Sequence, residues 1–420
     1  MAINASQFQY AVDALRRILP CEHPADVALS TFFRDNHKLG QQDRHFIAES
    51  VFAVLRRHAF LSAITAPNPT PKRLLVASLL RVRGLNVREL STVLTEAEQK
   101  WAGELKALNP ELTLAQRAEL PEWAVEALQA GGMADEELLA VGRAMQHPAP
   151  LDVRVNTIKA RRDDVLSELN HSGIDEADLT PLSPFGIRFK GKPALQRHPL
   201  FLEGKVEVQD EGSQLLGLLL APRRGEMVVD FCAGAGGKTL LLGALMASTG
   251  RLYALDISEK RLAKLKPRLA RSGLSNVHPQ LIASERDARI KRLAGKIDRV
   301  LVDAPCSGMG TLRRNPDLKL RQTPEGVANL NLTQAAILAA AAPLLKVGGR
   351  LVYATCSLLP SENEAIVEAF LAANPHFALL PANALLAEQR VEVDTGDYLR
   401  LTPALHNTDG FFAAALTRVA

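Results

Sequence analysis

The C-terminal half of the chain predicts an α/β fold built on a doubly wound parallel sheet. From residue 227 onward, short apolar segments alternate with helical patterns, and a glycine-rich turn follows the first apolar segment. Such sheets bind ligands at the carboxyl ends of their strands. The predicted strands cover residues 228–230, 251–256, 280–283, 299–303 and 350–355, with helices over 259–272 and 332–345 and a last, antiparallel strand over 410–417.

Two further domains are expected before this sheet. Residues 1–145 show apolar positions at helical spacing and predict an all-helical domain, whose first 90 residues carry 12 Lys and Arg against 7 Asp and Glu. Residues 146–225 predict a small α+β module, and residues 226–420 form the doubly wound domain. The basic first half of the helical domain suits contact with phosphate, although a solvated helix face explains the same charges.

The composition describes a globular chain. It has 420 residues, 47% of them hydrophobic, and a formal net charge of +4. The chain has no apolar run that predicts a membrane span, and its N-terminus lacks the apolar core of a signal peptide. Four cysteines without CxxC or Cys/His spacing predict free thiols, no metal site and a reducing cytoplasm. We expect a cytoplasmic monomer.

The glycine-rich turn, Cys232–Lys238, predicts a cofactor loop. It is not a Walker A loop, because Cys232 stands where that motif needs its first glycine. It is only half of a dinucleotide motif, because Thr239 replaces the third glycine. Asp256 ends the next strand 20 residues after Gly236 (256 − 236), the spacing of a carboxylate that binds ribose hydroxyls. These features suit NAD or S-adenosylmethionine, and Asp230 is either part of this site or a structural acid.

Two cysteines follow neighbouring predicted strands. Cys306 comes after the strand ending at Asp303, and Cys356 comes directly after residue 355. A lone buried cysteine is usually a small core residue, but two at one rim beside a cofactor loop indicate nucleophilic chemistry. Arg313 and Arg314 follow closely and suit RNA phosphate or a thiolate.

These motifs resemble those of a known family. VDAPCSGMGTLRRNPDLK and YATCSLLPSENE resemble the paired cysteine motifs of Sun/Fmu-type (RsmB-like) RNA cytosine-5 methyltransferases, and CAGAGGKT resembles their cofactor loop. The N-terminal QQDRHFIAESVFAVLRR resembles the NusB-like RNA-binding domain of the ribosomal RNA branch. The resemblance implies a Rossmann-like methyltransferase sheet, S-adenosylmethionine as cofactor and RNA as substrate. Within the family, the N-terminal resemblance favours small-subunit ribosomal RNA.

The resemblance also implies roles for individual residues. Cys356 would add to carbon 6 of cytosine, Cys306 would assist product release, and Asp303 would hold the cytosine edge. DNA cytosine-5 methyltransferases instead use the Pro-Cys thiol as nucleophile, so the two roles rest on analogy. For the acid near the adenosine we choose Glu285, with Ser284 and Asp287 open. The expected cofactor residues are Cys232, Ala233, Gly234, Ala235, Gly236, Gly237, Lys238, Asp256, Glu285 and Asp303, and the expected RNA-binding residues are Arg154, Arg313 and Arg314.

Two other functions remain open from the sequence. A non-catalytic RNA-binding ribosome assembly factor would retain the fold without the chemistry, but both cysteines and Asp303 are intact. A nicotinamide-dependent oxidoreductase would use the same loop and would leave the cysteine pair unexplained.

Overall fold

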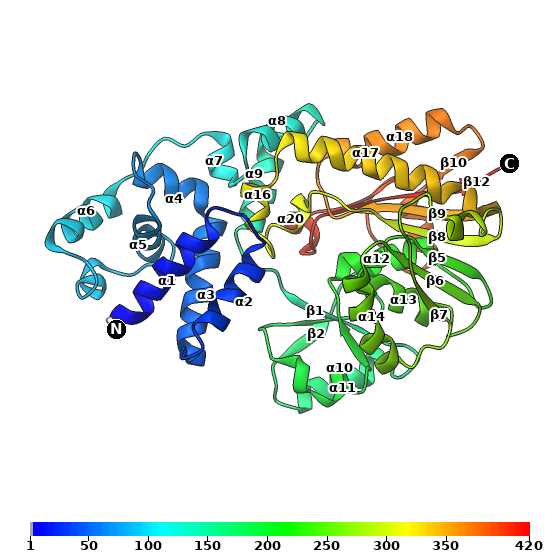
Figure 1. Cartoon of the computed structure of the whole chain (residues 1–420), viewed down its shortest axis with the longest axis horizontal. Coiled ribbons are helices and arrows are strands. Elements are labelled where there is room, and N and C mark those ends of the chain that lie inside the picture. Colours follow the sequence, from blue (N-terminus) through cyan, green and yellow to red (C-terminus); the bar gives the residue numbers. More distant parts are fainter. Residues whose placement is uncertain (1–2) are drawn as a thin grey trace. The chain divides into compact units, whose positions relative to one another are not determined.

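The computed structural model describes residues 3–420, which divide into two compact units. The first comprises residues up to Pro148 together with Thr311–Pro324, and the second comprises Ala149–Gly310 and Glu325–Ala420. Figure 1 labels the elements of both. The division into three domains that the sequence suggests stays a prediction.

The first unit is helical throughout its described residues. Helix α1 carries Phe8, Val12 and Leu15 on one buried face, the spacing that predicted it. Its helices are α1 (Ala5–Ile18), α2 (Ala25–Asp35), α3 (Gln41–Arg56), α4 (His58–Thr65), α5 (Pro71–Arg81), η1 (Val87–Leu90), α6 (Glu96–Ala107), α7 (Leu114–Ala118), α8 (Glu122–Ala130), α9 (Asp135–Met145) and α16 (Leu318–Arg321). Helix α16 belongs here through a buried ion pair between Lys319 and Glu119, 3.0 Å apart.

The second unit begins with a small antiparallel sheet in the order β2-β3-β1-β4. Strand β2 lies at the edge of this sheet, and only Ala177 of its three residues is buried. The elements are β1 (Leu151–Val155), α10 (Arg162–His171), β2 (Ala177–Leu179), β3 (Gly186–Phe189), η2 (Leu195–Arg197), α11 (Pro199–Leu202) and β4 (Val206–Val208). Helix α12 (Glu211–Leu220) leads from this sheet to the larger one.

The larger sheet has the strand order β10-β12-β9-β8-β5-β6-β7, with β11 paired to β12. Strands β5 to β9 are parallel, and β12 lies antiparallel beside β9, as predicted for the last strand. The strands are β5 (Met227–Asp230), β6 (Arg251–Asp256), β7 (Val277–Leu281), β8 (Ile297–Asp303), β9 (Leu345–Thr355), β10 (Phe377–Leu380), β11 (Leu399–Leu401) and β12 (Phe411–Arg418).

Helices cover both faces of this sheet (Figure 1), which confirms the doubly wound prediction. Alternate strand residues point to opposite faces, so Val228 packs with one layer and Val229 with the other. The helices are α13 (Gly237–Leu245), α14 (Glu259–Ser272), α15 (Ala288–Lys291), α17 (Pro324–Ala341), α18 (Glu364–Ala373), α19 (Ala382–Glu388) and α20 (Pro403–His406), with 3-10 turns η3 (Met309–Thr311), η4 (Ala342–Leu344) and η5 (Pro360–Glu362).

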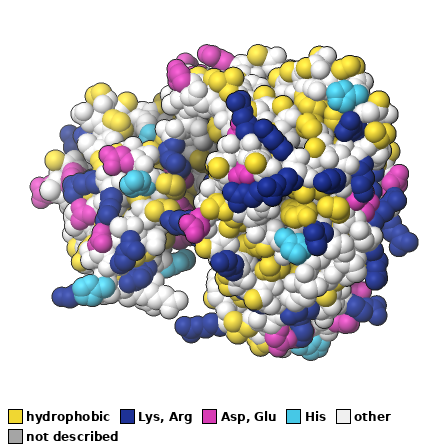
Figure 2. All heavy atoms as spheres, turned by 45° about the vertical axis from the view of Figure 1, so that its right-hand side comes forward, with side chains coloured by type: hydrophobic (Ala, Val, Ile, Leu, Met, Phe, Trp, Pro, Cys, Tyr) yellow, Lys and Arg dark blue, Asp and Glu magenta, His cyan; other side chains and the backbone are white. Residues whose placement is uncertain are grey.

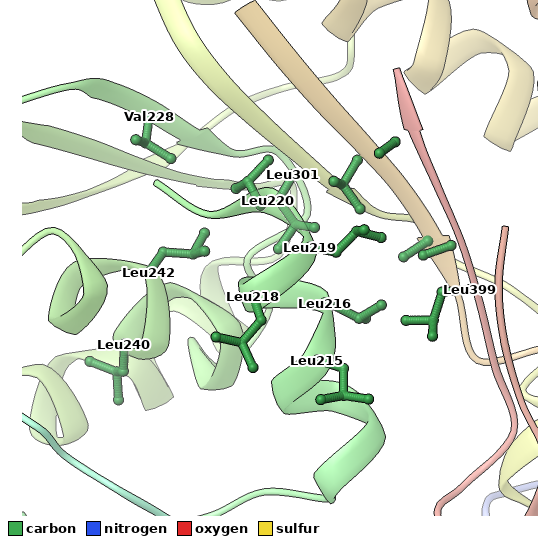
Figure 3. Close-up of a cluster of buried hydrophobic side chains, with 14 of the residues drawn as sticks. Leu215, Leu216, Leu218, Leu219, Leu220, Val228, Leu240, Leu242, Leu301 and Leu399 are labelled. Carbon is green, nitrogen blue, oxygen red and sulfur yellow. The ribbon is translucent and has the colours of Figure 1, made fainter. Parts of the chain in front are cut away.

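The core on the face of the larger sheet that α12 and α13 cover is built mainly from leucines. Figure 3 shows Leu218 of α12 facing Leu240 and Leu242 of α13, and Leu220 of the same helix near Leu301 of β8. Leu216 lies on the side of Leu399. Burying a leucine side chain contributes roughly 1.5–3 kcal/mol. This packing fixes α12 and α13 against the strands whose ends carry the candidate site.

Several predicted boundaries were wrong. Strand β9 begins at Leu345 rather than at residue 350. The third strand ends at Leu281 rather than at residue 283, and it is the edge strand β7, where Pro279 is tolerated because an edge has no partner on one side. Helix α17 starts at Pro324 rather than at residue 332 and ends at Ala341, because Pro343 interrupts the α-helical hydrogen bonds.

Helix α17 with the turn that follows it, Pro324–Leu344, is long and apolar enough to cross a membrane by length and composition. Among the described residues it is the one helix of this kind. Its buried side chains Ile337, Leu338 and Ala341 belong to the core on one face of the larger sheet. We therefore interpret it as a core helix.

Candidate functional site

The candidate site lies where four parallel strands of the larger sheet end. Strands β5, β6 and β8 end in Asp230, Asp256 and Asp303, and β9 ends one residue before Cys356. In register, Asp230 pairs with Leu301 of β8, and Asp303 pairs with Ala354 of β9. The parallel arrangement thus brings acids and thiols distant in sequence to one edge, as the sequence predicted.

The glycine-rich turn after β5 is held open by Asp256. The Asp256 carboxylate accepts hydrogen bonds from the backbone N–H of Gly234 (2.8 Å) and of Ser258 (2.7 Å). Gly236 has φ +85°, and a Cβ there would lie 2.1 Å from Leu265, so this position needs glycine. A Cβ on Gly234 would meet no atom within 4 Å, so that side of the loop is open.

This geometry fits a nucleoside cofactor. The loop exposes backbone beside a helix N-terminus at Gly237, where unpaired N–H groups favour polar ligands. Each Asp256 oxygen keeps a second lone pair after its backbone bond, which leaves acceptors for ribose hydroxyls. Ala233 donates its N–H to the carbonyl of Leu255 (2.8 Å), so the turn is fixed to the neighbouring strand.

Asp230 and Cys232 lie behind this loop. Asp230 is 1% exposed, and its Oδ2 accepts a 2.6 Å hydrogen bond from the Thr239 hydroxyl, while Oδ1 has no partner. Burial raises the pKa of the Asp230 carboxyl to about 7. Burial, together with Asp230, raises the pKa of the Cys232 thiol, which makes Cys232 a poor nucleophile. These contacts favour the structural interpretation of Asp230.

The raised pKa of Asp230 predicts a pH-dependent stability. The folded pKa of about 7 lies above the ordinary value of 3.8, so folding takes up a proton between these values and stability falls as pH rises from about 4 to about 7. Asp230→Asn keeps an acceptor for Thr239 and cannot ionise. We expect urea unfolding at pH 8 to show a more stable variant, by at most about 4 kcal/mol, with little difference at pH 4.5. A variant destabilised equally at both pH values would contradict this.

A partly buried ion pair lies between the predicted cofactor loop and strand β8. Lys238 Nζ is 2.6 Å from Asp303 Oδ2 and 5.7 Å from the centroid of the Phe411 ring. Burial alone would lower the pKa of Lys238, but the charge and hydrogen bond of Asp303 raise it, so the ammonium stays protonated. The sequence indicated both charged residues but neither their pairing nor the place of Phe411, which enters from the antiparallel strand β12.

The two predicted thiols meet. Cys306 Sγ lies 3.3 Å from Cys356 Sγ, and neither forms a disulfide. Gly310 joins the two loops, because its N–H donates to the Cys356 carbonyl (2.9 Å) and its own carbonyl accepts from Gly410 (2.7 Å). A Cβ on Gly310 would lie 2.2 Å from the Gly410 oxygen, so only glycine fits here.

The three residues predicted as possible contacts of the adenosine, Ser284, Glu285 and Asp287, lie in the segment after β7 and differ in their hydrogen bonds. Asp287 accepts the backbone N–H groups of Ala283 and Arg289 and caps α15, and the Arg289 side chain lowers the pKa of Asp287. Ser284 accepts the N–H of Arg286. Glu285 is half-buried and pairs with the Arg286 side chain at 3.3 Å. The Asp287 carboxylate thus already accepts backbone N–H groups, and Glu285 remains the residue predicted to contact the adenosine.

Two of the three arginines predicted to bind RNA are buried. Arg154 is 1% exposed and donates to Gln209 at 2.6 Å. Burial lowers the pKa of Arg154 to about 10. This position contradicts the prediction that Arg154 contacts phosphate. Alternation along β1 places Arg154 on the face opposite the core residues Val153 and Val155, and that face is buried as well, which a count of basic residues cannot reveal. Arg313 is also buried, at 3%, and Arg314 is half-buried.

The described part of the chain holds no group of side chains placed to bind a metal ion. Among residues 3–420, no group of three or more His, Cys, Asp or Glu side chains is placed to hold a metal ion.

Comparison with known proteins agrees with this geometry. Residues 217–417 match the family model described as 16S rRNA methyltransferase RsmB/F, and residues 120–196 match its ferredoxin-like domain. A probable ribosomal RNA small subunit methyltransferase B of Synechocystis sp. is 34% identical over 99% of this chain and 100% of its own length. The chain belongs to the RsmB/F family of ribosomal RNA methyltransferases.

Other relatives lead to the same family. A probable ribosomal RNA small subunit methyltransferase B of Bacillus subtilis is 28% identical, covering 97% of this chain and 98% of its own. The solved structure of PH0851 covers 100% of both chains with TM-score 0.78 and 25% identity. A methyltransferase homologue from Pyrococcus horikoshii covers 71% of this chain and 100% of its own, with TM-score 0.58 and 30% identity.

Membership of the RsmB/F family confirms the Rossmann-like methyltransferase sheet and S-adenosylmethionine as cofactor. Ribosomal RNA is the substrate class. The contacts of individual residues with cofactor and RNA, and the NusB-like character of the helical unit, stay predictions.

Proposed function

We propose that this protein transfers a methyl group to carbon 5 of a cytosine in small-subunit ribosomal RNA through a covalent adduct with Cys356. The observation that carries the proposal is the pair of thiols 3.3 Å apart at the ends of adjacent strands, beside the Lys238–Asp303 pair. Carbon 5 of cytosine is a weak nucleophile. A thiolate that adds to carbon 6 makes carbon 5 electron-rich, so a thiol at this rim has a defined task.

The electrostatics make Cys306 a poor thiolate. The contact with Cys356 and burial together raise the pKa of the Cys306 thiol, because two close thiols do not both ionise. The Lys238 ammonium interacts electrostatically with Cys356 and stabilises negative charge there. In the breakdown that follows methylation, carbon 5 loses its proton to solvent, the bond between carbon 6 and sulfur breaks, and Cys356 leaves as the thiolate. The protonated Cys306 thiol, 3.3 Å away, is placed to donate a hydrogen bond to the departing sulfur.

The remaining side chains hold the reactants. Asp303 accepts from Lys238 through one oxygen, and its other oxygen would accept from the cytosine amino group. Asp256 and the 232–238 loop would hold S-adenosylmethionine, which supplies an electrophilic methyl group when bound. A cytosine within a duplex has to be flipped out to reach this buried edge.

Ribosomal RNA also requires a surface for phosphate. Figure 2 shows Lys and Arg side chains spread over the visible face with fewer acids among them, in keeping with 50 Lys and Arg against 46 Asp and Glu in the chain. Within the helical unit, Arg44 stacks over Phe33 and Arg73 over Trp101, and such arginine–aromatic pairs suit single-stranded RNA. These surfaces, rather than Arg154, are the better candidates for RNA contact.

Cofactor binding tests the role of Asp256. Asp256→Ala removes the acceptor for ribose hydroxyls and also releases the Gly234 N–H. We expect titration calorimetry to show S-adenosylmethionine binding weakened by about 1.5–3 kcal/mol. Glu259→Ala, one turn along on the exposed start of α14, is the control and should bind normally. Wild-type affinity in Asp256→Ala would place the ribose elsewhere.

The proposal as a whole is tested on the product. The protein is incubated with 16S ribosomal RNA and S-adenosylmethionine, the RNA is digested to nucleosides, and these are separated by liquid chromatography with mass detection. We expect 5-methylcytidine as the new nucleoside. Methyl groups on another base, or on another atom of cytosine, would contradict the proposal.

A further inference from the structure

A buried carboxylate lies directly behind the two cysteines. Glu362 is 0% exposed, and three donors converge on it. They are the Ser307 backbone N–H (2.8 Å), the Ser307 hydroxyl (2.5 Å) and Gln334 Nε2 (3.0 Å). A buried carboxylate requires such donors because its desolvation is otherwise unfavourable.

These bonds fix the residues on both sides of Cys306. Gln334 Nε2 also donates to the carbonyl of Pro305 (2.9 Å), so the residue before Cys306 and the residue after it are both tied to the same pair of side chains. The carbonyl of Glu362 in turn accepts the hydroxyl of Tyr353 (2.6 Å), which lies near the end of β9. The Cys306 loop is therefore anchored to the sheet through Glu362.

Asn363, the next residue in the chain, forms hydrogen bonds to the residues on both sides of Cys356. Asn363 accepts the Thr355 hydroxyl (2.5 Å) and donates to the Ser357 carbonyl (3.1 Å), which brackets Cys356 from both sides. The Ser307 and Ser357 hydroxyls lie 3.2 Å apart and connect the hydrogen bonds around Cys306 with those around Cys356. Because Ser307 donates to the carboxylate, Ser357 is the donor in this contact.

We propose that Glu362 is a positioning residue for Cys306 and Asn363 a positioning residue for Cys356. The inference rests on the proposed function, in which Cys356 makes the adduct and Cys306 assists its breakdown. Loss of the hydrogen bonds of Glu362 and loss of those of Asn363 therefore affect different steps. Without Glu362, addition by Cys356 continues and elimination slows; without Asn363, addition itself slows.

The test measures two quantities on denaturing gels and in single-turnover assays with 16S ribosomal RNA. Glu362→Ala is expected to reduce turnover by roughly 10–100-fold, the scale of a misplaced catalytic group, and to accumulate covalent protein–RNA complex. Glu362→Gln keeps an acceptor for the Ser307 N–H and should restore most of the turnover and remove the excess complex. Asn363→Ala, the matched variant one residue away, should lose turnover without accumulating complex.

Cys306→Ala serves as the reference for a stalled elimination. If Cys306→Ala accumulates complex and a folded Glu362→Ala does not, the positioning role is wrong while the proposed function stands. Accumulation in Asn363→Ala equal to that in Glu362→Ala would also overturn it, because both would then act through general loosening. If Cys306→Ala forms no complex, the proposed function and this inference fail together. Should Glu362→Ala unfold, Ser307→Ala removes only the hydroxyl bonds and is expected to shift complex accumulation in the same direction.

Discussion

Cys356→Ala is expected to abolish methyl transfer and to form no covalent complex with RNA. The thiol at this position makes the only bond that activates carbon 5 in the proposed reaction, and the neighbouring Cys306 thiol has its pKa raised by Cys356 and by burial. Removing a covalent nucleophile lowers turnover on the order of 10⁴–10⁶-fold. Methyl incorporation into 16S ribosomal RNA, followed with labelled S-adenosylmethionine, measures the loss.

Cys21→Ala is the matched control. Cys21 is a half-buried free thiol of the helical unit and belongs to neither cysteine loop. Its replacement should leave methyl transfer at the wild-type level. Substantial activity in Cys356→Ala would show that covalent catalysis does not depend on this thiol.

Cys306→Ala is expected to give the opposite phenotype, accumulation of the covalent complex. Cys356 retains Lys238 and its own hydrogen-bonded loop, so attack on the base remains possible. The contact at 3.3 Å that places a second thiol beside the adduct is lost, and elimination slows. A nuclease-sensitive band of reduced mobility on denaturing gels should mark most of the protein after incubation with RNA.

The reverse pattern would exchange the two roles. A complex that appears with Cys356→Ala and not with Cys306→Ala would make Cys306 the nucleophile, as in the alternative order known from DNA cytosine-5 methyltransferases. Equal and full activity in both variants would remove cysteine catalysis from the account.

Much of the candidate site could be predicted from the sequence because its signals are local. Gly236 requires a positive φ and Asp256 ends its strand at the expected spacing. Cys356 follows β9 directly, and Cys306 lies three residues after the end of β8. In a parallel sheet, chain order and strand ends suffice to bring such residues to one rim. The antiparallel final strand was likewise predicted and is confirmed.

The contacts that depend on side-chain direction were not predictable. Arg154 was predicted to bind RNA as a basic residue, yet both faces of β1 are buried and its side chain donates a hydrogen bond to Gln209 instead. Glu362 stood in a quoted motif without a role, since its partners Ser307 and Gln334 are 55 and 28 residues away. Segments distant in sequence meet only through the fold, and one sequence read alone carries no signal for such pairs.

The central claim is that Cys356 bonds to carbon 6 of the target cytosine, and substrate RNA containing 5-fluorocytosine tests it most directly. Fluorine on carbon 5 takes the place of the proton that has to leave, so the adduct stops before elimination. After incubation of the wild-type protein with S-adenosylmethionine, the trapped complex is digested and the modified peptide is sequenced by mass spectrometry. The account predicts one nucleotide joined to the peptide at Cys356. A nucleotide joined at Cys306, or RNA that stays free of the protein while unsubstituted RNA is methylated, would contradict it.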